Sequence, residues 1–429
     1  MLEIKIYNTM KTTTKYILLT SIATLTTTTI LAQEAQTNDN SRNWQDNESL
    51  FLSQAVEHVA KDSGFTPIAS WTGEYWSNLE GGTKTGSEWD SLITFGFEQD
   101  LSKPTNKNWG TFGITAFWYT QSGDIMENIC STPHATTGHA ASNIFSGEMV
   151  RVFEIFYKNE FETKNGTFGF RIGQLAADED FMGMDYSDLF LNANLGAIPT
   201  NAGMELFGSN GSWAFSQYAL ATLGATIYWN NDNLDAIVGI YNGDAGRDVS
   251  SNHGFDYDIR NVAVWYQVGY NYELFDLAGR FQFGGNYHNG KFENKYTGEA
   301  ERNFYSFYLG LQQDFIADKD GNAILGGFVR IAYTPQEEIS GCDKYIDCGL
   351  NWFAPLPCRD DDVLGIAFSG MRLGEQYYHY DNLVEITYKA QITKAIAIQP
   401  TFQTYLNAKN ENDKTNVAYV FGVRAEINF

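Results

Sequence analysis

The sequence lacks the long apolar run that a membrane-spanning helix needs, and its mean hydropathy is −0.32. Proline is scarce, with 8 residues among 429, and 28 Lys and Arg stand against 52 Asp and Glu. The resulting net charge of −24 argues against nucleic-acid binding, which relies on basic patches. The sequence also has no phosphate-binding loop, zinc-protease motif or nucleophile elbow, so we expect neither a cofactor, nor a metal, nor a catalytic centre.

Aromatic residues and glycine are abundant instead. The chain has 25 Tyr, 30 Phe and 10 Trp, together 15% of the residues, and 40 Gly. Many aromatics and glycines with few prolines suit a long antiparallel sheet with tight turns and aromatic girdles. This composition predicts an all-β chain.

The end of the chain gives the clearest pattern. Val417, Tyr419 and every second residue up to the terminal Phe429 are apolar or aromatic, whereas Arg424, Glu426 and Asn428 lie on the other face. A period of two residues predicts a strand with one apolar and one polar face. Such a strand at the end of the chain is typical of an outer-membrane β-barrel.

The first 64 residues differ from the rest. Residues 1–32 have the basic start and the apolar, threonine-rich run of a signal peptide, with residues 1–9 as a possible upstream extension before Met10. Residues 33–64 form a polar leader and a short helix, predicted from the apolar spacing of residues 49–61. Residues 65–429 are predicted to form the barrel.

Strand patterns then recur to the end of the chain. The predicted strands cover residues 68–78, 92–101, 111–120, 149–161, 167–175, 225–230, 236–241, 262–272, 277–288, 304–315, 323–333, 363–373, 382–392, 397–406 and 417–429. Short turns alternate with long loops at 121–148 and 176–212, as in a transmembrane antiparallel barrel with short periplasmic turns and long outer loops. A large soluble sandwich, propeller or double barrel shares the period of two residues and stays open as an alternative.

Four cysteines are present, and three of them, Cys342, Cys348 and Cys358, cluster in one predicted loop. An even number of cysteines in an oxidising compartment permits disulfides. We favour a possible disulfide between Cys342 and Cys348, which leaves Cys130 with Cys358. Four cysteines allow three pairings, and the sequence does not choose between them.

Several segments, taken in order, resemble the OprB-type carbohydrate-selective porin family. The most specific is RIGQLAADEDFMGMDYSDLFLNANLG at 171–196, and others are WTGEY at 71–75, IYNGD at 240–244, FVRIAYTP at 328–335, GLNWFAPLPCRDDDVLG at 349–365 and IQPTFQTYLN at 398–407. The resemblance covers residues 50–429, with departures at Cys358, where a glycine is usual, and in an insertion near 128–143. It implies a barrel of about sixteen strands that passes sugars, often glucose.

Candidate pore-lining residues follow from a cost argument. Charged side chains on the lipid face of a strand are destabilising, so charged and long polar residues within strands should face the lumen. This rule selects Arg151, Glu154, Arg171, Gln174, Arg280, Arg330, Arg372, Glu385, Arg424 and Glu426. They either contact sugar or form an ion-pair network that stiffens the wall.

The segment 176–196 is a candidate constriction loop. Asp178, Glu179, Asp180, Asp185 and Asp188 lie among Phe181, Tyr186 and Phe190. Acidic groups beside aromatic rings suit sugar contact, and they suit the pinning of a folded loop equally well. Shortening residues 178–188 should change the conductance of a single channel if this loop narrows the pore.

The sequence thus predicts a passive, sugar-preferring porin in the outer membrane of a Gram-negative bacterium. A general cation-preferring porin, an occluded structural barrel and a barrel enzyme of the lipase or protease type remain alternatives. The expected partners are carbohydrates, outer-membrane lipid and lipopolysaccharide, and the barrel-assembly machinery through Phe429. The chain is expected to be a monomer or a trimer.

Overall fold

The structure is a computed structural model. It describes residues 50, 63–130, 139–196, 214–245, 254–255, 257–340, 342–373, 380–409 and 415–429. The predicted signal peptide, and nearly all of the predicted leader and short helix, lie outside the described residues. Within the part described, no helix has both the length and the apolar character needed to cross a bilayer.

Sixteen antiparallel strands close into one barrel, in which every strand pairs with its neighbours in the chain. The strands are β1 (Phe65–Glu80), β2 (Gly86–Asp100), β3 (Thr111–Gln121), β4 (Met149–Thr163), β5 (Gly166–Leu175), β6 (Thr222–Asn230), β7 (Leu234–Asn242), β8 (Val262–Leu274), β9 (Leu277–Glu293), β10 (Ala300–Ala317), β11 (Ala323–Tyr333), β12 (Cys342–Phe353), β13 (Val363–Leu373), β14 (Tyr380–Thr393), β15 (Ile396–Lys409) and β16 (Thr415–Asn428). The predicted all-β barrel of about sixteen strands is confirmed.

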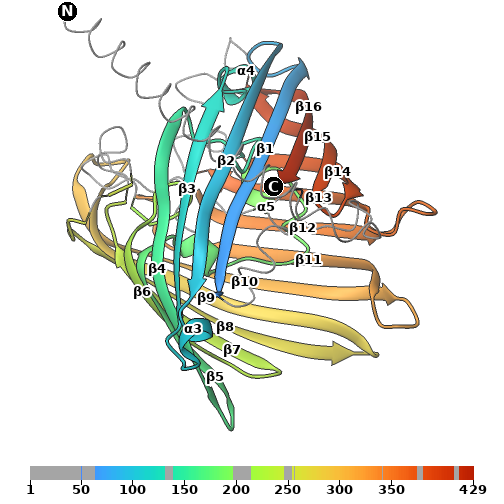
Figure 1. Cartoon of the computed structure of the whole chain (residues 1–429). Helices are drawn as coiled ribbons and strands as arrows, with labels where there is room; N and C mark the ends of the chain where they lie inside the picture. The colour runs from blue at the N-terminus through green and yellow to red at the C-terminus, as the bar shows by residue number, and fades with distance from the viewer. Residues whose placement is uncertain are drawn as a thin grey trace, which may run out of the picture.

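The two ends of the barrel chain form its seam. Strand β1 pairs with β16 from Ser70 opposite Asn428 to Glu80 opposite Tyr419, and the amide of Phe429 donates to the carbonyl of Ala69 at 3.0 Å. Figure 1 shows the blue first strand beside the red last strand. Because β1 and β16 pair along this seam, the barrel is closed and has no free edge strand, which is the condition for a sheet to span a membrane.

Alternation along each strand separates the two faces of the wall. In β10, Phe304, Ser306 and Tyr308 are buried toward the interior, whereas Phe307 and Leu309 are 39% and 37% exposed on the outside. The predicted faces of β16 hold in the same way, because Arg424 is buried while Tyr419 and Phe421 are exposed. The outer face is therefore apolar and the inner face is largely polar, as a barrel in lipid requires.

The connections differ in length at the two ends of the barrel. Only residues 164–165, 231–233, 275–276 and 394–395 connect four of the strand pairs at one end, and that end also carries the chain terminus after β16. The opposite end carries the long connections 122–148, 176–221 and 243–261. By the rule of short periplasmic turns and long outer loops, the first end is periplasmic.

Among the described residues, the connections carry four short helical turns. They are α3 (Ser102–Thr105), α4 (Met126–Ile129), the 3₁₀ turn η2 (Ala177–Glu179) and α5 (Ala193–Gly196). Of these, η2 and α5 belong to the long connection between β5 and β6. That connection provides most of the site described below.

Strand β12 corrects the interpretation of the cysteines. Cys342 and Cys348 lie in this strand, not in a loop, and six residue steps along the extended strand separate their Cα atoms by about 20 Å. A disulfide needs Cα atoms within about 7 Å, so the favoured bond between Cys342 and Cys348 is wrong. The complementary pair fails as well, because Cys358 lies in the periplasmic connection after β12 and Cys130 follows α4 at the outer end.

Candidate functional site

The segment from Ala176 to Gly196 leaves the end of β5 and crosses the interior of the barrel. We call it the pore loop. Its apolar residues pack inward, with Phe181, Met182 and Phe190 at most 1% exposed. Glu179, Asp185 and Asp188 are exposed on its other side. The loop therefore has one face packed on the wall and one acidic edge facing the water of the lumen.

The start of the pore loop is held by charged residues of β4 and β5. The amide of Ala176 donates to Glu154 Oε1 at 2.9 Å, and Glu154 also forms a close ion pair with Arg171. Arg171 reaches Asp180 of the loop at 3.3 Å and lies 4.4 Å from the ring of Phe156. Arg171 thus joins the wall to the loop through two carboxylates.

The middle of the pore loop is tied to the opposite strands. Gln267 of β8 accepts the amide of Met182 at 2.9 Å, and Asn351 of β12 donates to the carbonyl of Tyr186 at 2.9 Å. The hydroxyl of Tyr186 donates to Asp314 of β10 in a short hydrogen bond. These contacts come from strands on both sides of β11, so the loop spans the lumen instead of lying along one strand.

Arg330 of β11 is a buried clamp on the same loop. Its guanidinium donates to the carbonyls of Asn194 at 2.8 Å and Leu195 at 2.7 Å, and it pairs with Asp347 of β12 at 2.6 Å. Arg330 is 1% exposed and Asp347 is fully buried. A buried pair of this kind tolerates the loss of neither partner, because the remaining charge would be left without compensation.

Glu385 of β14 holds the far end of the pore loop. One of its carboxylate oxygens accepts the amide of Leu191 at 2.8 Å and the hydroxyl of Thr401 at 2.9 Å, and the other accepts the amide of Asn192 at 3.0 Å. Gln399 adds a donor to the carbonyl of Leu189 at 2.6 Å. The loop is therefore anchored at both ends and in the middle.

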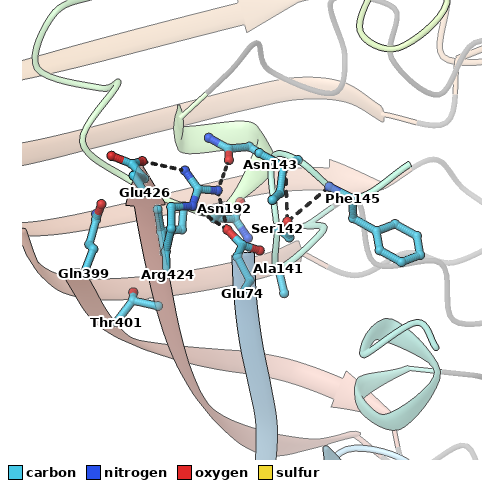
Figure 2. Close-up of polar contacts among 12 residues, drawn as sticks. Glu74, Ala141, Ser142, Asn143, Phe145, Asn192, Gln399, Thr401, Arg424 and Glu426 are labelled. Atoms are coloured by element: carbon cyan, nitrogen blue, oxygen red, sulfur yellow. Dashed lines mark hydrogen bonds and ion pairs between the residues drawn. The ribbon is translucent and has the colours of Figure 1, made fainter. Parts of the chain in front are cut away.

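A second inward segment, residues 139–148 before β4, which we call the second loop, lies against the pore loop. Arg424 of β16 bonds to Glu74 of β1 across the seam and to the side chain of Asn143, with Glu426 at 3.8 Å (Figure 2). The side-chain amide of Asn143 then donates to the carbonyl of Phe190 in the pore loop at 3.4 Å. Arg424 thus connects the seam of the barrel to both inward loops.

A serine, a histidine and an aspartate also meet in this region. His139 Nδ1 lies 3.1 Å from Asp381 Oδ2, and His139 Nε2 lies 2.9 Å from Ser369 Oγ. His139 and Ser369 are fully buried, and Ser369 also bonds to Tyr345. A nucleophile has to be reached by substrate, so this arrangement attaches the second loop to the wall and gives no active site.

The acidic groups of the pore loop have perturbed proton affinities. Enclosure within the barrel raises the pKa of Asp178 to about 8, helped by the neighbouring Glu179, although the amide of Tyr218 bonds to its carboxylate at 2.8 Å. Enclosure raises the pKa of Asp180 as well, against the opposing effect of Arg171. The loop therefore carries less negative charge near neutral pH than its composition suggests.

Most of the predicted pore residues lie on the inner face, but most of them bind protein groups. Arg151, Glu154, Arg330, Glu385 and Arg424 are buried. Arg280 pairs with Asp235 at 2.6 Å, and Glu426 pairs with Lys389 at 2.7 Å. The structure thus brings Glu154, Arg171, Arg330 and Glu385 together around the pore loop, while Arg280 lies apart from the loop in a wall ion pair.

Two predicted residues depart from the pore-lining rule. Gln174 is buried and donates its amide to the carbonyls of Val152 at 3.1 Å and Phe153 at 2.7 Å, where β4 has an irregular register. Arg372 lies beside the inward-facing Met371, on the opposite face and at the outer end of β13, where it bonds to Asp343 and Glu337. The prediction of a lumen-facing side chain is wrong for Arg372, because a charged residue on the outer face costs little free energy beyond the hydrocarbon layer.

The charge rule missed the neutral anchors and one strand. Gln267, Asn351 and Gln399 hold the loop with amide groups, which a search for charges does not select. Asp347 and Tyr345 were missed because the cysteines of β12 suggested a loop. The alternation of Asp343, Tyr345 and Asp347 with Lys344, Ile346 and Cys348 was the available signal.

A closed sixteen-stranded barrel with an apolar outer face and a loop folded across its interior is the architecture of an outer-membrane porin. Residues 93–429 match the family model described as carbohydrate-selective porin, OprB family. The chain belongs to this family and is a carbohydrate-selective porin of the Gram-negative outer membrane, without enzymatic activity. A search of curated protein sequences gives no match.

Two solved structures from Pseudomonas putida share the fold. The high-pH structure of OprB superposes with a TM-score of 0.79 at 14% identity, covering 90% of this chain and 100% of that one. The low-pH structure of OprB gives a TM-score of 0.55 at 12% identity, covering 90% and 99%. At these identities the likeness concerns the fold alone.

Proposed function

We propose that the protein lets neutral, glucose-like mono- and oligosaccharides diffuse passively along the acidic edge of the pore loop. The observation that carries the proposal is the crossing of the lumen by residues 176–196, with Glu179, Asp185 and Asp188 exposed on the free side. Carboxylates accept hydrogen bonds from sugar hydroxyls, and the nearby Tyr186 offers an aromatic face. Weak contacts of this kind allow a sugar both to enter and to leave.

The buried predicted residues have a supporting part in this proposal. Arg330 and Glu385 form hydrogen bonds with carbonyls and amides of the loop, so we propose that they position the loop and do not contact sugar. Arg171 fixes the first turn of the loop through Asp180. The width of the pore then depends on how firmly the wall holds the loop.

Planar-bilayer conductance titrated with glucose and several other sugars tests the proposal. A current that falls saturably with one sugar, in a channel whose conductance rises when residues 178–188 are shortened, is the expected result. Open channels that ignore every sugar would contradict a sugar-binding constriction. Unchanged conductance after shortening would contradict the assignment of the constriction to this loop.

General cation passage is the second candidate, favoured by one observation. The pore loop contains five acidic residues, Asp178, Glu179, Asp180, Asp185 and Asp188, and no Lys, Arg or His. An acidic constriction favours cations over anions. The reversal potential in a salt gradient measures the ion preference, and sugar block of the current separates the two candidates, because a sugar-binding pore shows this block whatever its ion preference.

Membrane lipid and the barrel-assembly machinery are the other partners that we propose. We propose that the apolar outer face contacts phospholipid and, at its outer end, lipopolysaccharide, and that the last strand with Phe429 is presented to the barrel-assembly machinery. The amide of Phe429 already completes the seam with Ala69, so the terminal residue belongs to the closing step of the barrel. Crosslinking in native membranes would report these contacts together with the oligomeric state, monomer or trimer.

A further inference from the structure

The outer face of the barrel has a hollow over strands β8 and β10–β14, with a volume of about 640 Å³. Its walls include Leu311, Phe315, Gly327, Cys348 and Leu350. Phe315 and Leu350 are 49% and 44% exposed and lie on the outward face of their strands. The hollow thus opens toward the membrane and not toward the lumen.

Two small residues, Val329 and Cys348, form the floor of the hollow beside Gly327. A Cβ added at Gly327 would come within 2.9 Å of both Leu350 and Phe315 and within 2.6 Å of the carbonyl oxygen of Gly349, so Phe315 and Leu350 already fill the space over this glycine. Val329 follows on the same face of β11, and Cys348 is the small residue opposite Val329 on β12. Larger residues around them form the rim, so the floor is lower than the surrounding wall.

The hollow extends from the periplasmic end of the wall toward its middle, where Cys348, Phe368 and Val384 line it. It reaches Leu274, the last residue of β8, and it includes Leu311 to Phe315 near the periplasmic end of β10. Those five residues of β10 span about 14 Å, close to the roughly 15 Å that one leaflet contributes to the hydrocarbon core. Tyr272 and Gln313 line the periplasmic end of the hollow, where the side-chain amide of Gln313 donates to the carbonyl of Ala278 at 3.0 Å.

We propose that this hollow is a binding site for one acyl chain of a phospholipid from the periplasmic leaflet. The lining is almost wholly apolar, so it accepts hydrocarbon and offers no polar group to a sugar. An unfilled hollow forfeits dispersion contacts, and a chain that enters it regains them. Tyr272 at the periplasmic end lies where tyrosines meet the headgroup level. The chain therefore runs from the periplasmic headgroup up into the wall.

Photo-crosslinking in reconstituted vesicles tests the proposal directly. The vesicles contain phosphatidylethanolamine and phosphatidylglycerol, with a small fraction of phospholipid that carries a diazirine in the middle of one acyl chain. We expect adducts on residues 311–315, 327–329 and 348–350 at several times the yield on 234–240 of β7. Strand β7 is a matched control because its Val238 and Ile240 are 46% and 49% exposed on the outer face of the barrel, which contacts the same lipid.

Two filling variants and one control sharpen the test. Cys348→Phe fills the hollow from β12 and Val329→Phe fills it from β11, so each should lower the adduct yield to that of β7. Ile240→Phe adds a ring on the far wall and should leave the yield unchanged. Two filling variants keep the test valid if one of them fails to fold.

Three outcomes would overturn the proposal. Adducts spread evenly around the barrel would mean that the hollow holds no chain preferentially, and a yield that Cys348→Phe and Val329→Phe leave unchanged would mean that the adducts form elsewhere. Covalent dimers through Cys348 with a bismaleimide, in the absence of lipid adducts, would assign the hollow to a second copy of the chain. Sugar block of the current should persist in Cys348→Phe, because the hollow lies outside the lumen.

Discussion

Replacing Glu385 by glutamine should release the far end of the pore loop. The carboxylate accepts the amides of Leu191 at 2.8 Å and Asn192 at 3.0 Å, one on each oxygen. Thr401 and Gln403 donate to the same two oxygens at 2.9 Å and 3.3 Å. Glutamine offers one acceptor oxygen and turns an NH2 group toward two donors, so two of the four hydrogen bonds are lost.

The expected magnitude follows from the charge of the acceptor. A hydrogen bond to a charged group contributes about 1.5–3 kcal/mol, so two lost bonds weaken the anchorage by roughly 3–6 kcal/mol. At about 1.4 kcal/mol per factor of ten, the population of detached loop rises by a factor on the order of 10² to 10⁴. Single-channel conductance should rise, and the saturable block by sugar should weaken.

Thr401→Val provides the matched control. It removes one hydroxyl donor and leaves both backbone amides on Glu385, so conductance and sugar block should stay close to the parent values. Heat-modifiable gel mobility checks that both variants form the closed barrel. A folded Glu385→Gln channel with the parent conductance and sugar block would refute the assignment of Glu385 as an anchor of a constricting loop.

Three further predictions concern the loop, its clamp and the seam. The pKa of Asp178 is raised from 3.8 to about 8, so the folded loop holds a proton that the unfolded chain releases, and the stability of the loop should fall as pH rises through this window. Hydrogen exchange of residues 176–196, corrected for the intrinsic rate, should therefore increase from pH 6 to pH 9. The increase should be smaller in Asp178→Asn. Arg330→Met leaves Asp347 buried without its partner and should cost about 3–5 kcal/mol in denaturant unfolding, whereas Arg330→Met combined with Asp347→Leu should cost less than the single change. Deletion of Phe429 removes the hydrogen bond that its backbone amide donates to the carbonyl of Ala69, which contributes about 1 kcal/mol. The protein should therefore still refold in detergent, while the amount of protein in the outer membrane falls.

The sequence was sufficient for the barrel because strand alternation is local. The faces of β16 follow from apolar residues at every second position, and the pairing of neighbours in the chain leaves little choice of topology. Strand β12 has the same alternation, but its clustered cysteines favoured the prediction of a loop. A local pattern was thus a better guide than the residue type.

The site was less predictable because its contacts are distant in the chain. Charged side chains are destabilising on the lipid face, and this rule correctly placed Arg330 and Glu385 inside the barrel. The rule could not show that they bind backbone groups of the pore loop. Those groups lie 135 residues from Arg330, at Leu195, and 194 residues from Glu385, at Leu191. A rule about which face a side chain occupies does not say which loop will cover it.

The seam between β1 and β16 has a consequence for how the protein forms. Glu74 and Arg424, which meet across it, are 350 residues apart in the chain. Every nascent chain that has not yet completed β16 therefore exposes two unpaired strand edges, and such edges recruit other strands. Contacts of such long range are also slow to form. A chain truncated before its last fourteen-residue strand remains an open, aggregation-prone sheet, however many of its other fifteen strands have paired.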